Sequence, residues 1–318
     1  MMNSAKKAKI QADGNAQPVR GRLTERDIAL FEYLYEMPGM IPEQINKLLF
    51  PKPYATQKAS SRCLHRLTFL ARAGFLQPVE QLTYYSQGKR PFRYFLREPA
   101  LSLVAQRRGI DLDELDWNPK DTQATHDFQE HRHALHEVRI GFILAARQHS
   151  ATIEQWIDER MLKRTEGKVY VTIKGAQGAA YKIAVIADGF CRLKMTTDKT
   201  YTYYQFIELD RSTETGQPTK WSRNSWQRKI LGYNALFTPG GQGQPSVYQQ
   251  RYGGTEKGRV LTITTGDKRL ANLKRITEQN GGKSKYWFTT LEAIKTNDIL
   301  TDPIWQKAGS EGKFRLTW

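Results

Sequence analysis

Three carboxylates beside apolar, strand-like runs are the residues of this chain best suited to chemistry. Asp188 follows the run 183–187, and Glu208 and Asp210 close a run that begins at Tyr203. Because residues i and i+2 of a β-strand point to the same face, Glu208 and Asp210 should project together. Acids at the ends of adjacent strands predict a divalent-metal site at Asp188, Glu208 and Asp210, and hard oxygen ligands favour Mg²⁺ or Mn²⁺.

The charge of the chain indicates what such a metal would act on. Lys and Arg number 49 against 32 Asp and Glu, which gives a formal net charge of +17. This excess favours a polyanionic partner, and nucleic acid is the most common one. No apolar run of the sequence approaches the roughly 18 to 20 residues of a membrane span, and its first residues lack the apolar core of a signal peptide. We therefore expect a cytoplasmic protein with no membrane partner.

The first part of the chain has the pattern of a basic arm followed by a winged helix-turn-helix. Residues 1–22 are polar and basic with no hydrophobic period, which is typical of a disordered arm. Residues 23–97 predict three helices and a hairpin, the order of a winged helix. The expected elements are helices from Thr24, Pro42 and about Ala55 to Ala73, and strands at 75–85 and 92–96.

Six basic residues lie where a winged helix contacts DNA. They are Lys58, Arg62 and Arg66 on the third expected helix, and Lys89, Arg90 and Arg93 in or beside the hairpin. The first three recur every four residues and so share one helix face. A helix that enters the major groove and a wing that reaches the backbone need basic groups in these places. The alternatives are an ordinary solvated helix face and a winged helix that contacts proteins.

The second part of the chain predicts a larger α/β domain. Residues 98–124 form a linker with one short helix, and the domain covers 125–318. Its expected elements are a helix at 126–149, strands at 153–157, 169–173, 181–187 and 200–210, a helix at 220–237, a strand at 259–264, a helix at 268–279 and a strand at 286–290. The fold class is therefore mixed α+β, with a central mixed sheet in the second domain.

This order of helix, acidic strands, helix and strand resembles the PD-(D/E)XK nuclease fold. In that superfamily an Asp ends the second core strand, and a Glu two residues before a Lys lies on the third. The resemblance implies that Asp188 and Glu208 hold the metal ion beside the scissile phosphate. The chain departs from the pattern at Asp210, which stands where the Lys is expected. Lys229 or Lys220 on the following helix, or Arg211, is then needed as the catalytic cation.

Several stretches also resemble the replication-relaxation family of plasmid and mobile-element proteins. They are Ala187–Gly189, Phe206–Glu214, Lys229–Tyr233, Arg259–Thr265, Arg269–Arg275 and His133–His136, together with the winged helix at 24–96. The resemblance covers about residues 24–310 and implies DNA binding in replication, relaxation or transfer of an element. The implied partners are double-stranded DNA, other replication or mobilisation proteins, and a second copy of the chain.

Two activities fit this resemblance. The first is a metal-dependent DNA nickase or endonuclease with Asp188, Glu208, Asp210 and Lys229 as its catalytic residues. The second is a non-catalytic DNA-binding initiator or regulator with a degenerate nuclease domain. In that case Asp188 would form a simple turn with the glycine after it, and the other two acids would pair with arginines. The candidate arginines are Arg211, Arg223 and Arg228.

A third alternative is a tyrosine relaxase. Histidines crowd the start of the long helix, at His126, His131, His133 and His136, and three tyrosines on one strand could include a nucleophile, namely Tyr201, Tyr203 and Tyr204. The expected helix argues against this reading, because two residues at i and i+2 of a helix diverge by about 200°. His131 and His133 would then not face one metal ion.

Overall fold

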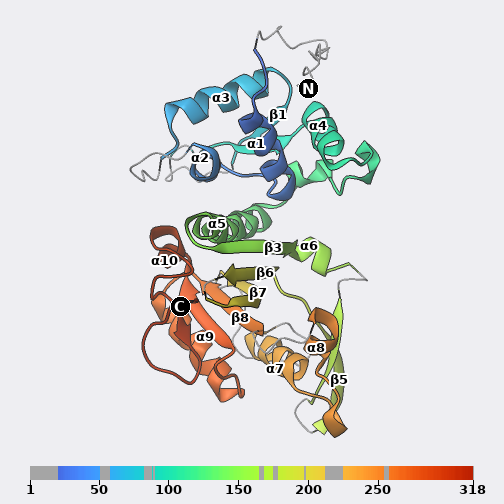
Figure 1. Cartoon of the computed structure of the whole chain (residues 1–318), viewed down its shortest axis with the longest axis vertical. Helices are drawn as coiled ribbons and strands as arrows, with labels where there is room; N and C mark the ends of the chain where they lie inside the picture. The colour runs from blue at the N-terminus through green and yellow to red at the C-terminus, as the bar shows by residue number, and fades with distance from the viewer. Residues whose placement is uncertain are drawn as a thin grey trace. The chain divides into compact units, whose positions relative to one another are not determined.

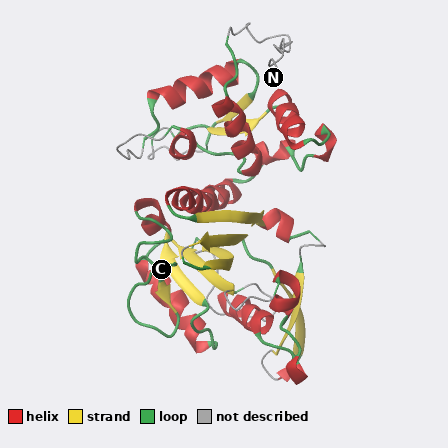
Figure 2. Cartoon of the chain, viewed as in Figure 1, coloured by secondary structure: helices red, strands yellow, loops and turns green. Residues whose placement is uncertain are grey.

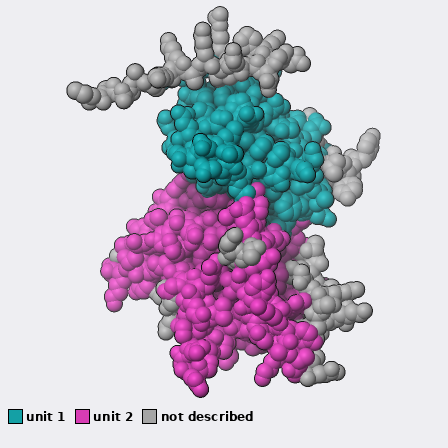
Figure 3. Space-filling model, turned by 90° about the vertical axis from the view of Figure 1, so that its right-hand side faces the viewer, with its two compact units in different colours: residues 1–136 teal, residues 137–318 magenta. Residues whose placement is uncertain are grey.

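The computed structural model describes most of the chain as two compact units, residues 1–136 and residues 137–318 (Figure 3). The division falls inside one long helix, α5 (His126–Gln148). Since the placement of the two units relative to each other is not determined, each is described by itself. The described residues are 21–50, 58–81, 88, 90–164, 168–174, 178–196, 198–211, 225–253 and 258–317.

The first unit contains the three helices and two strands that the sequence predicts. Its elements are α1 (Glu25–Glu36), α2 (Pro42–Leu49), α3 (Ser61–Arg72), β1 (Leu76–Val79), β2 (Arg93–Leu96) and α4 (Glu98–Arg108) (Figure 1). Thr24 caps α1 in a capping box with Asp27, and Pro42 opens α2. β1 and β2 pair antiparallel, with Leu76 opposite Leu96. Short 3₁₀ turns at Leu112–Glu114 (η1) and Pro119–Gln123 (η2) lead to α5.

The second unit is built on a six-stranded mixed sheet (Figure 2). Its order is β10-β9-β8-β7-β6-β3, with β3, β6 and β7 antiparallel and β7, β8 and β9 parallel. The strands are β3 (Ala151–Asp158), β6 (Gly189–Thr196), β7 (Thr200–Asp210), β8 (Gly258–Thr264), β9 (Tyr286–Thr290) and β10 (Gln306–Lys307). A parallel neighbour requires a crossover, and the helix α7 (Trp226–Phe237) lies between β7 and β8 in the chain.

A hairpin and several helices complete this unit. β4 (Val169–Lys174) and β5 (Ala180–Val185) pair with each other in a separate two-stranded sheet. The helices are α6 (Glu159–Leu162), α7, α8 (Val247–Tyr252), α9 (Asp267–Gln279) and α10 (Leu291–Thr296), with a 3₁₀ turn at Gly241–Gly243 (η4). Among the described residues, no helix is long and apolar enough to cross a lipid bilayer.

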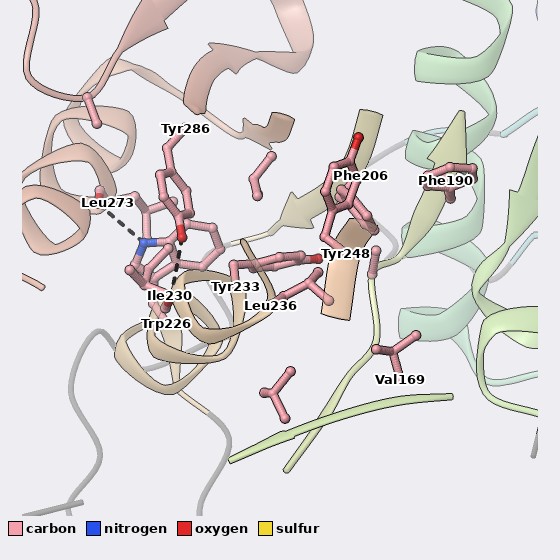
Figure 4. Close-up of a cluster of buried hydrophobic side chains, with 14 of the residues drawn as sticks. Val169, Phe190, Phe206, Trp226, Ile230, Tyr233, Leu236, Tyr248, Leu273 and Tyr286 are labelled. Carbon is pink, nitrogen blue, oxygen red and sulfur yellow. Dashed lines mark hydrogen bonds between the residues drawn. The ribbon is translucent and has the colours of Figure 1, made fainter. Parts of the chain in front are cut away.

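One apolar core joins the hairpin, the sheet and helices α7, α8 and α9 (Figure 4). Phe206 of β7 lies edge-on to Tyr233 of α7, with ring centroids 5.7 Å apart. Trp226 is fully buried, and its indole donates hydrogen bonds to the carbonyl of Leu273 and to Thr277 on α9. α7 is therefore fixed against the sheet, and this fixes the side chains that it presents to the end of β7.

The structure differs from the sequence prediction mainly at β6. The sequence analysis placed Asp188 at the end of a strand over 181–187, whereas β5 ends at Val185 and Asp188 directly precedes β6. Cys191, Leu193 and Met195 of β6 alternate with Arg192 and Lys194, which is the period of a half-buried strand. β6, and not β5, is therefore the neighbour of β7. The cysteines Cys63 and Cys191 are both buried and free.

Candidate metal centre and nucleic-acid interface

Asp188 lies where the start of β6 meets the end of β7. Its amide donates a hydrogen bond to the carbonyl of Ile207 at 3.0 Å. Its Oδ2 accepts a hydrogen bond of 2.7 Å from the Leu209 amide. Because β6 runs antiparallel to β7, the first residue of one strand meets the last residues of the other. This pairing brings Asp188 beside Glu208 even though 20 residues separate them.

Glu208 is held from two sides by α7. The Lys229 Nζ donates to Oε2 at 2.8 Å, and the Tyr233 hydroxyl donates to Oε1 at 2.5 Å. Lys229 and Tyr233 are four residues apart on a helix and so share one face. Ser225 caps the start of this helix by accepting from the Arg228 amide. Glu208 is 1% exposed, so both oxygens of a buried carboxylate are satisfied by one turn of α7.

Burial has the largest effect on the pKa of the Glu208 carboxylate. Burial raises the pKa of Glu208 to about 7, Lys229 lowers it, and the negative charge of Asp188 raises it. Burial and the charge of Glu208 together hold the pKa of Tyr233 well above its ordinary value, so Tyr233 stays a hydrogen-bond donor at neutral pH. A carboxylate with a pKa near 7 binds a cation in competition with a proton. Glu208 therefore binds a cation in its deprotonated form, which prevails above about pH 7.

These residues line one cavity of about 250 Å³. Its charged lining consists of Glu159, Asp188 and Glu208 together with Lys163, Arg228 and Lys229. A carboxylate oxygen of Glu159 lies within 4.8 Å of one of Asp188. Glu159 also pairs with Lys163 on the next turn, at 2.5 Å. Oxygen ligands and cations thus face the same space, which is the arrangement needed to hold a divalent metal ion and a phosphate together.

Asp210 is placed differently from the other predicted ligands. Arg269 of α9 binds it through two hydrogen bonds, from Nε to Oδ2 at 2.7 Å and from Nη2 to Oδ1 at 2.8 Å. Thr264 of β8 donates a third at 3.2 Å. Asp210 is 3% exposed and is absent from the described residues that line the cavity. It does share a face of β7 with Glu208, as the strand period predicts, but an arginine occupies both of its oxygens.

Sequence reasoning missed three residues of this region. Glu159 follows β3 directly, and only the antiparallel pairing of β3 with β6 brings it to Asp188. Tyr233 is buried in the core, yet its hydroxyl reaches Glu208. Arg269 lies in the first turn of α9, just after β8, and β8 ends beside the end of β7. This position in the chain was the one feature of the sequence that could have pointed to Arg269. The expected partners for the acids, Arg211, Arg223 and Arg228, did not include it. Arg223 and Lys220 lie outside the described residues.

The helix α3 presents a different face from the one predicted. It begins at Ser61, so Lys58 precedes the helix and does not continue the stripe of Arg62 and Arg66. Arg66 donates from Nε to Asp27 of α1 at 2.7 Å, and the Asp27 side chain is 2% exposed. Burial raises the pKa of Asp27, but hydrogen bonds from Arg66 and Thr24 outweigh it and hold the pKa below its ordinary value. Arg62 is exposed.

The predicted basic residues of the hairpin are bound within the same unit. Arg93 is buried and donates to Glu130 at 2.6 Å and to the Gln129 carbonyl at 2.8 Å. Arg90 donates to the same carboxylate of Glu130 at 2.8 Å. Lys89 lies outside the described residues. These arginines therefore fasten the hairpin to the start of α5, and Arg62 and Lys58 are the exposed members of the predicted DNA-contact set.

The tyrosines and histidines of the relaxase alternative are placed as follows. Tyr203 is fully buried beneath Arg259, whose guanidinium carbon lies 4.6 Å from the ring centroid. Tyr204 is 8% exposed. His131 and His133 lie within α5, so their side chains diverge as the helical prediction requires. Burial gives Tyr203 and Tyr204 poor access to a phosphodiester, which weighs against either as the nucleophile, whereas Tyr201 is half-buried.

Comparison with known proteins assigns the family. The sequence profile of the replication-relaxation family matches residues 31–249, more than half of the chain. The chain belongs to the replication-relaxation family. No curated protein matches it. Among solved structures, this replication-relaxation protein is similar to the restriction endonuclease FokI bound to DNA, with 13% sequence identity over 85% of this chain and a TM-score of 0.23. It spans 43% of the FokI chain.

Proposed function

We propose that this replication-relaxation protein binds double-stranded DNA of a plasmid or mobile element and nicks or cuts it with a divalent metal ion. The observation that carries the proposal is the cavity in which Asp188, Glu208 and Lys229 converge. Two of these residues come from neighbouring strand ends and the third from the crossover helix. This supports the resemblance to a PD-(D/E)XK nuclease domain, with Lys229 in place of the lysine that the strand lacks.

The lining of the cavity fits a hard divalent cation. Glu159, Asp188 and Glu208 offer carboxylate oxygens only, which suit Mg²⁺ or Mn²⁺. Burial is the main cause of the raised pKa of Glu208, and a cation bound at this carboxylate would lower that pKa, as Lys229 does. These three acids would hold the ion. When bound, it supplies Lewis-acid chemistry at the phosphodiester.

The other residues of the cavity act on the substrate and on the acids. The Lys229 side chain is 25% exposed and lines the cavity, where its charge would neutralise charge that develops on the phosphate. Arg228 lines the same space and would hold a phosphate oxygen. Tyr233 fixes the orientation of Glu208 by its hydrogen bond and keeps its own proton. Asp210, bound by Arg269, would fix the end of β7 as a positioning residue.

A non-catalytic DNA-binding initiator or regulator is the second candidate, and one observation favours it. Glu208 and Asp210 both have their oxygens bound by side chains of the protein, as in a structural ion-pair network. In that case the second unit would bind DNA or a partner protein without cleaving it. Salt-sensitive DNA binding is expected of both candidates, so binding does not separate them.

Cleavage separates the two candidates directly. We expect the wild-type protein to nick or cut supercoiled DNA that carries its site when Mg²⁺ or Mn²⁺ is present, and to leave it intact in EDTA. The conversion of supercoiled DNA into open-circular and linear forms on a gel measures this. A protein that binds DNA but leaves supercoiled and linear substrates intact with every ion would establish the non-catalytic candidate instead.

Two arginines of α3 should respond differently to substitution if the first unit is a winged helix that binds DNA. Arg62→Ala should weaken DNA binding and reduce the salt slope by about 1, because one phosphate contact is lost. The melting temperature of the Arg62→Ala protein should stay unchanged, since Arg62 is exposed. Arg66→Ala should instead destabilise the unit by about 1 to 3 kcal/mol, a value discounted for the 24% exposure of Arg66, because Asp27 is left buried without its partner.

Fluorescence anisotropy with labelled duplex DNA and thermal unfolding measure the two effects. The double variant Asp27→Asn/Arg66→Ala serves as the control: it should cost less stability than Arg66→Ala alone, since it removes the unpaired charge and keeps an oxygen that accepts from the Thr24 amide. If Arg66→Ala weakened DNA binding at an unchanged melting temperature, Arg66 would be a DNA contact and not a structural residue.

A further inference from the structure

The β4–β5 hairpin forms a second surface beside the cavity. Its inner face packs against α7, where Gly232 allows close approach: a Cβ at Gly232 would lie 3.1 Å from Ile183 Cδ1 and 3.3 Å from Val185 Cγ2. Val171 on the same inner face is 5% exposed. Figure 4 shows Val169 of β4 beside the cluster formed by α7 and the sheet. The hairpin is therefore supported by the helix that carries Lys229.

The outer face of the hairpin combines an aromatic ring with lysines. Tyr170, Thr172 and Lys174 alternate along β4, and all three are exposed. In register across from them lie Ala184, Lys182 and Ala180. Tyr170 is 49% exposed, one of the most exposed large hydrophobic residues described. Lys182 Nζ lies 5.1 Å from the centroid of its ring.

The hairpin reaches the cavity at the end of β5. Residues 183–186, at and directly after the end of β5, line the cavity together with residues of α7. At the same end of the hairpin, before β4 begins, α6 supplies the exposed Arg160, and Lys163 directly follows the helix and lines the cavity. A polyanion bound on the hairpin would thus contact these basic residues between the hairpin and the acids of the cavity.

We infer that the outer face of the β4–β5 hairpin binds an unpaired DNA strand, with a base stacked on Tyr170 and phosphates on Lys174 and Lys182. A flat sheet face with an exposed ring beside cations is a surface on which single-stranded nucleic acid stacks, because every base has a π-face. Ala184 and Ala180 opposite Tyr170 and Lys174 leave room above the sheet. The paired bases of a duplex present no free face to such a ring, and the net charge of +17 favours a polyanion over a neutral protein.

The inference rests on the proposed function for its biological meaning, since it makes locally unpaired DNA the substrate delivered to the cavity. Its test does not require cleavage. In EDTA, a fluorescein-labelled oligothymidylate of about 20 nucleotides should bind the full-length protein, and Tyr170→Ala should weaken that binding about tenfold, the loss of one stacked base. Tyr170→Phe, which keeps the ring, should bind like the wild type.

Substitutions of the two lysines, with control variants and a duplex, test whether the hairpin is specific for a single strand. Lys174→Gln/Lys182→Gln should reduce the salt slope of oligothymidylate binding by about 1 to 2, one for each lost phosphate contact. Lys295→Gln, at an exposed lysine of α10, should leave this salt slope unchanged. A blunt duplex of the same length should lose little affinity in Tyr170→Ala. All of these binding measurements are made in EDTA, so an inactive nuclease centre would leave their result standing.

Three outcomes would overturn the inference. Tyr170→Ala could bind the oligothymidylate as tightly as the wild type, which would leave the ring without a role. Duplex and single strand could lose affinity equally, which would make the hairpin a general electrostatic surface. Finally, binding could be lost in Tyr170→Phe as well as in Tyr170→Ala, which would point to the hydroxyl and not to stacking.

Discussion

A Lys229→Ala protein is expected to lose DNA cleavage by about 10² to 10³-fold while it remains folded. Lys229 Nζ is the cation bound to Glu208, at 2.8 Å, and it lines the cavity beside Asp188. Its removal takes away the positive charge that would stabilise charge on the phosphate in the transition state. Because Lys229→Ala leaves the buried Glu208 without its cation, it should also lower the free energy of unfolding by about 1 to 3 kcal/mol, which leaves the protein folded.

The pH dependence should change in a defined direction. Burial raises the pKa of Glu208 to about 7, and Lys229 lowers it from a still higher value. Glu208 must lose its proton before it can bind a cation. Cleavage by the wild type should therefore fall as the pH drops through about 7, and in Lys229→Ala the residual activity should need a higher pH.

The measurement is the initial rate of nicking across a pH series with Mg²⁺. Lys229→Arg should retain part of the activity because it keeps the charge. The matched control is Lys274→Ala, which removes a lysine of α9 that pairs with Glu278 one turn away. Should Lys229→Ala cleave at the wild-type rate with the wild-type pH profile, another residue would supply the cation.

Substitution of Asp210 should have the largest effect on stability. Asp210→Ala is expected to lower the free energy of unfolding by about 3 kcal/mol, because it leaves the guanidinium of Arg269 without its partner near the core. The Asp210 side chain is 2% exposed and that of Arg269 is 19% exposed, so little solvent screens the pair. Thr264 also loses the acceptor of its hydroxyl.

Urea denaturation followed by tryptophan fluorescence measures this change. The double variant Asp210→Ala/Arg269→Met should be more stable than Asp210→Ala alone, since it removes the unpaired charge. Asp198→Ala, at an exposed aspartate between β6 and β7, should change the stability by less than about 0.5 kcal/mol. If Asp210→Ala unfolded like the wild type but no longer bound Mn²⁺, Asp210 would be the metal ligand that the sequence predicted.

The sequence predicts the strand that carries the acids because its residues follow simple local patterns. The expected strand at 200–210 matches β7, and the expected helix at 126–149 matches α5 to within a residue. Period and capping residues decide such elements, and both are visible locally. The common face of Glu208 and Asp210 follows from the same period.

The surroundings of these acids could not be predicted in the same way. Asp188 reaches Glu208 through β6, a strand that the sequence analysis overlooked although Arg192 and Lys194 alternate with apolar residues. Asp210 meets Arg269 across 59 residues, and Arg66 meets Asp27 across 39. A basic residue on a helix looks the same in the sequence whether it binds a phosphate or a buried carboxylate. Only the structure shows that Arg66 binds the buried Asp27 whereas Arg62 is exposed.

The most direct test of the account is cleavage of supercoiled DNA by Asp188→Asn beside the wild type, each with Mg²⁺, Mn²⁺ or EDTA. The asparagine keeps an oxygen that can accept the hydrogen bond of the Leu209 amide, so the end of β7 should stay intact. The account predicts metal-dependent nicking by the wild type and none by Asp188→Asn at equal DNA binding. Equal cleavage by the two proteins, or cleavage by the wild type in EDTA, would contradict it.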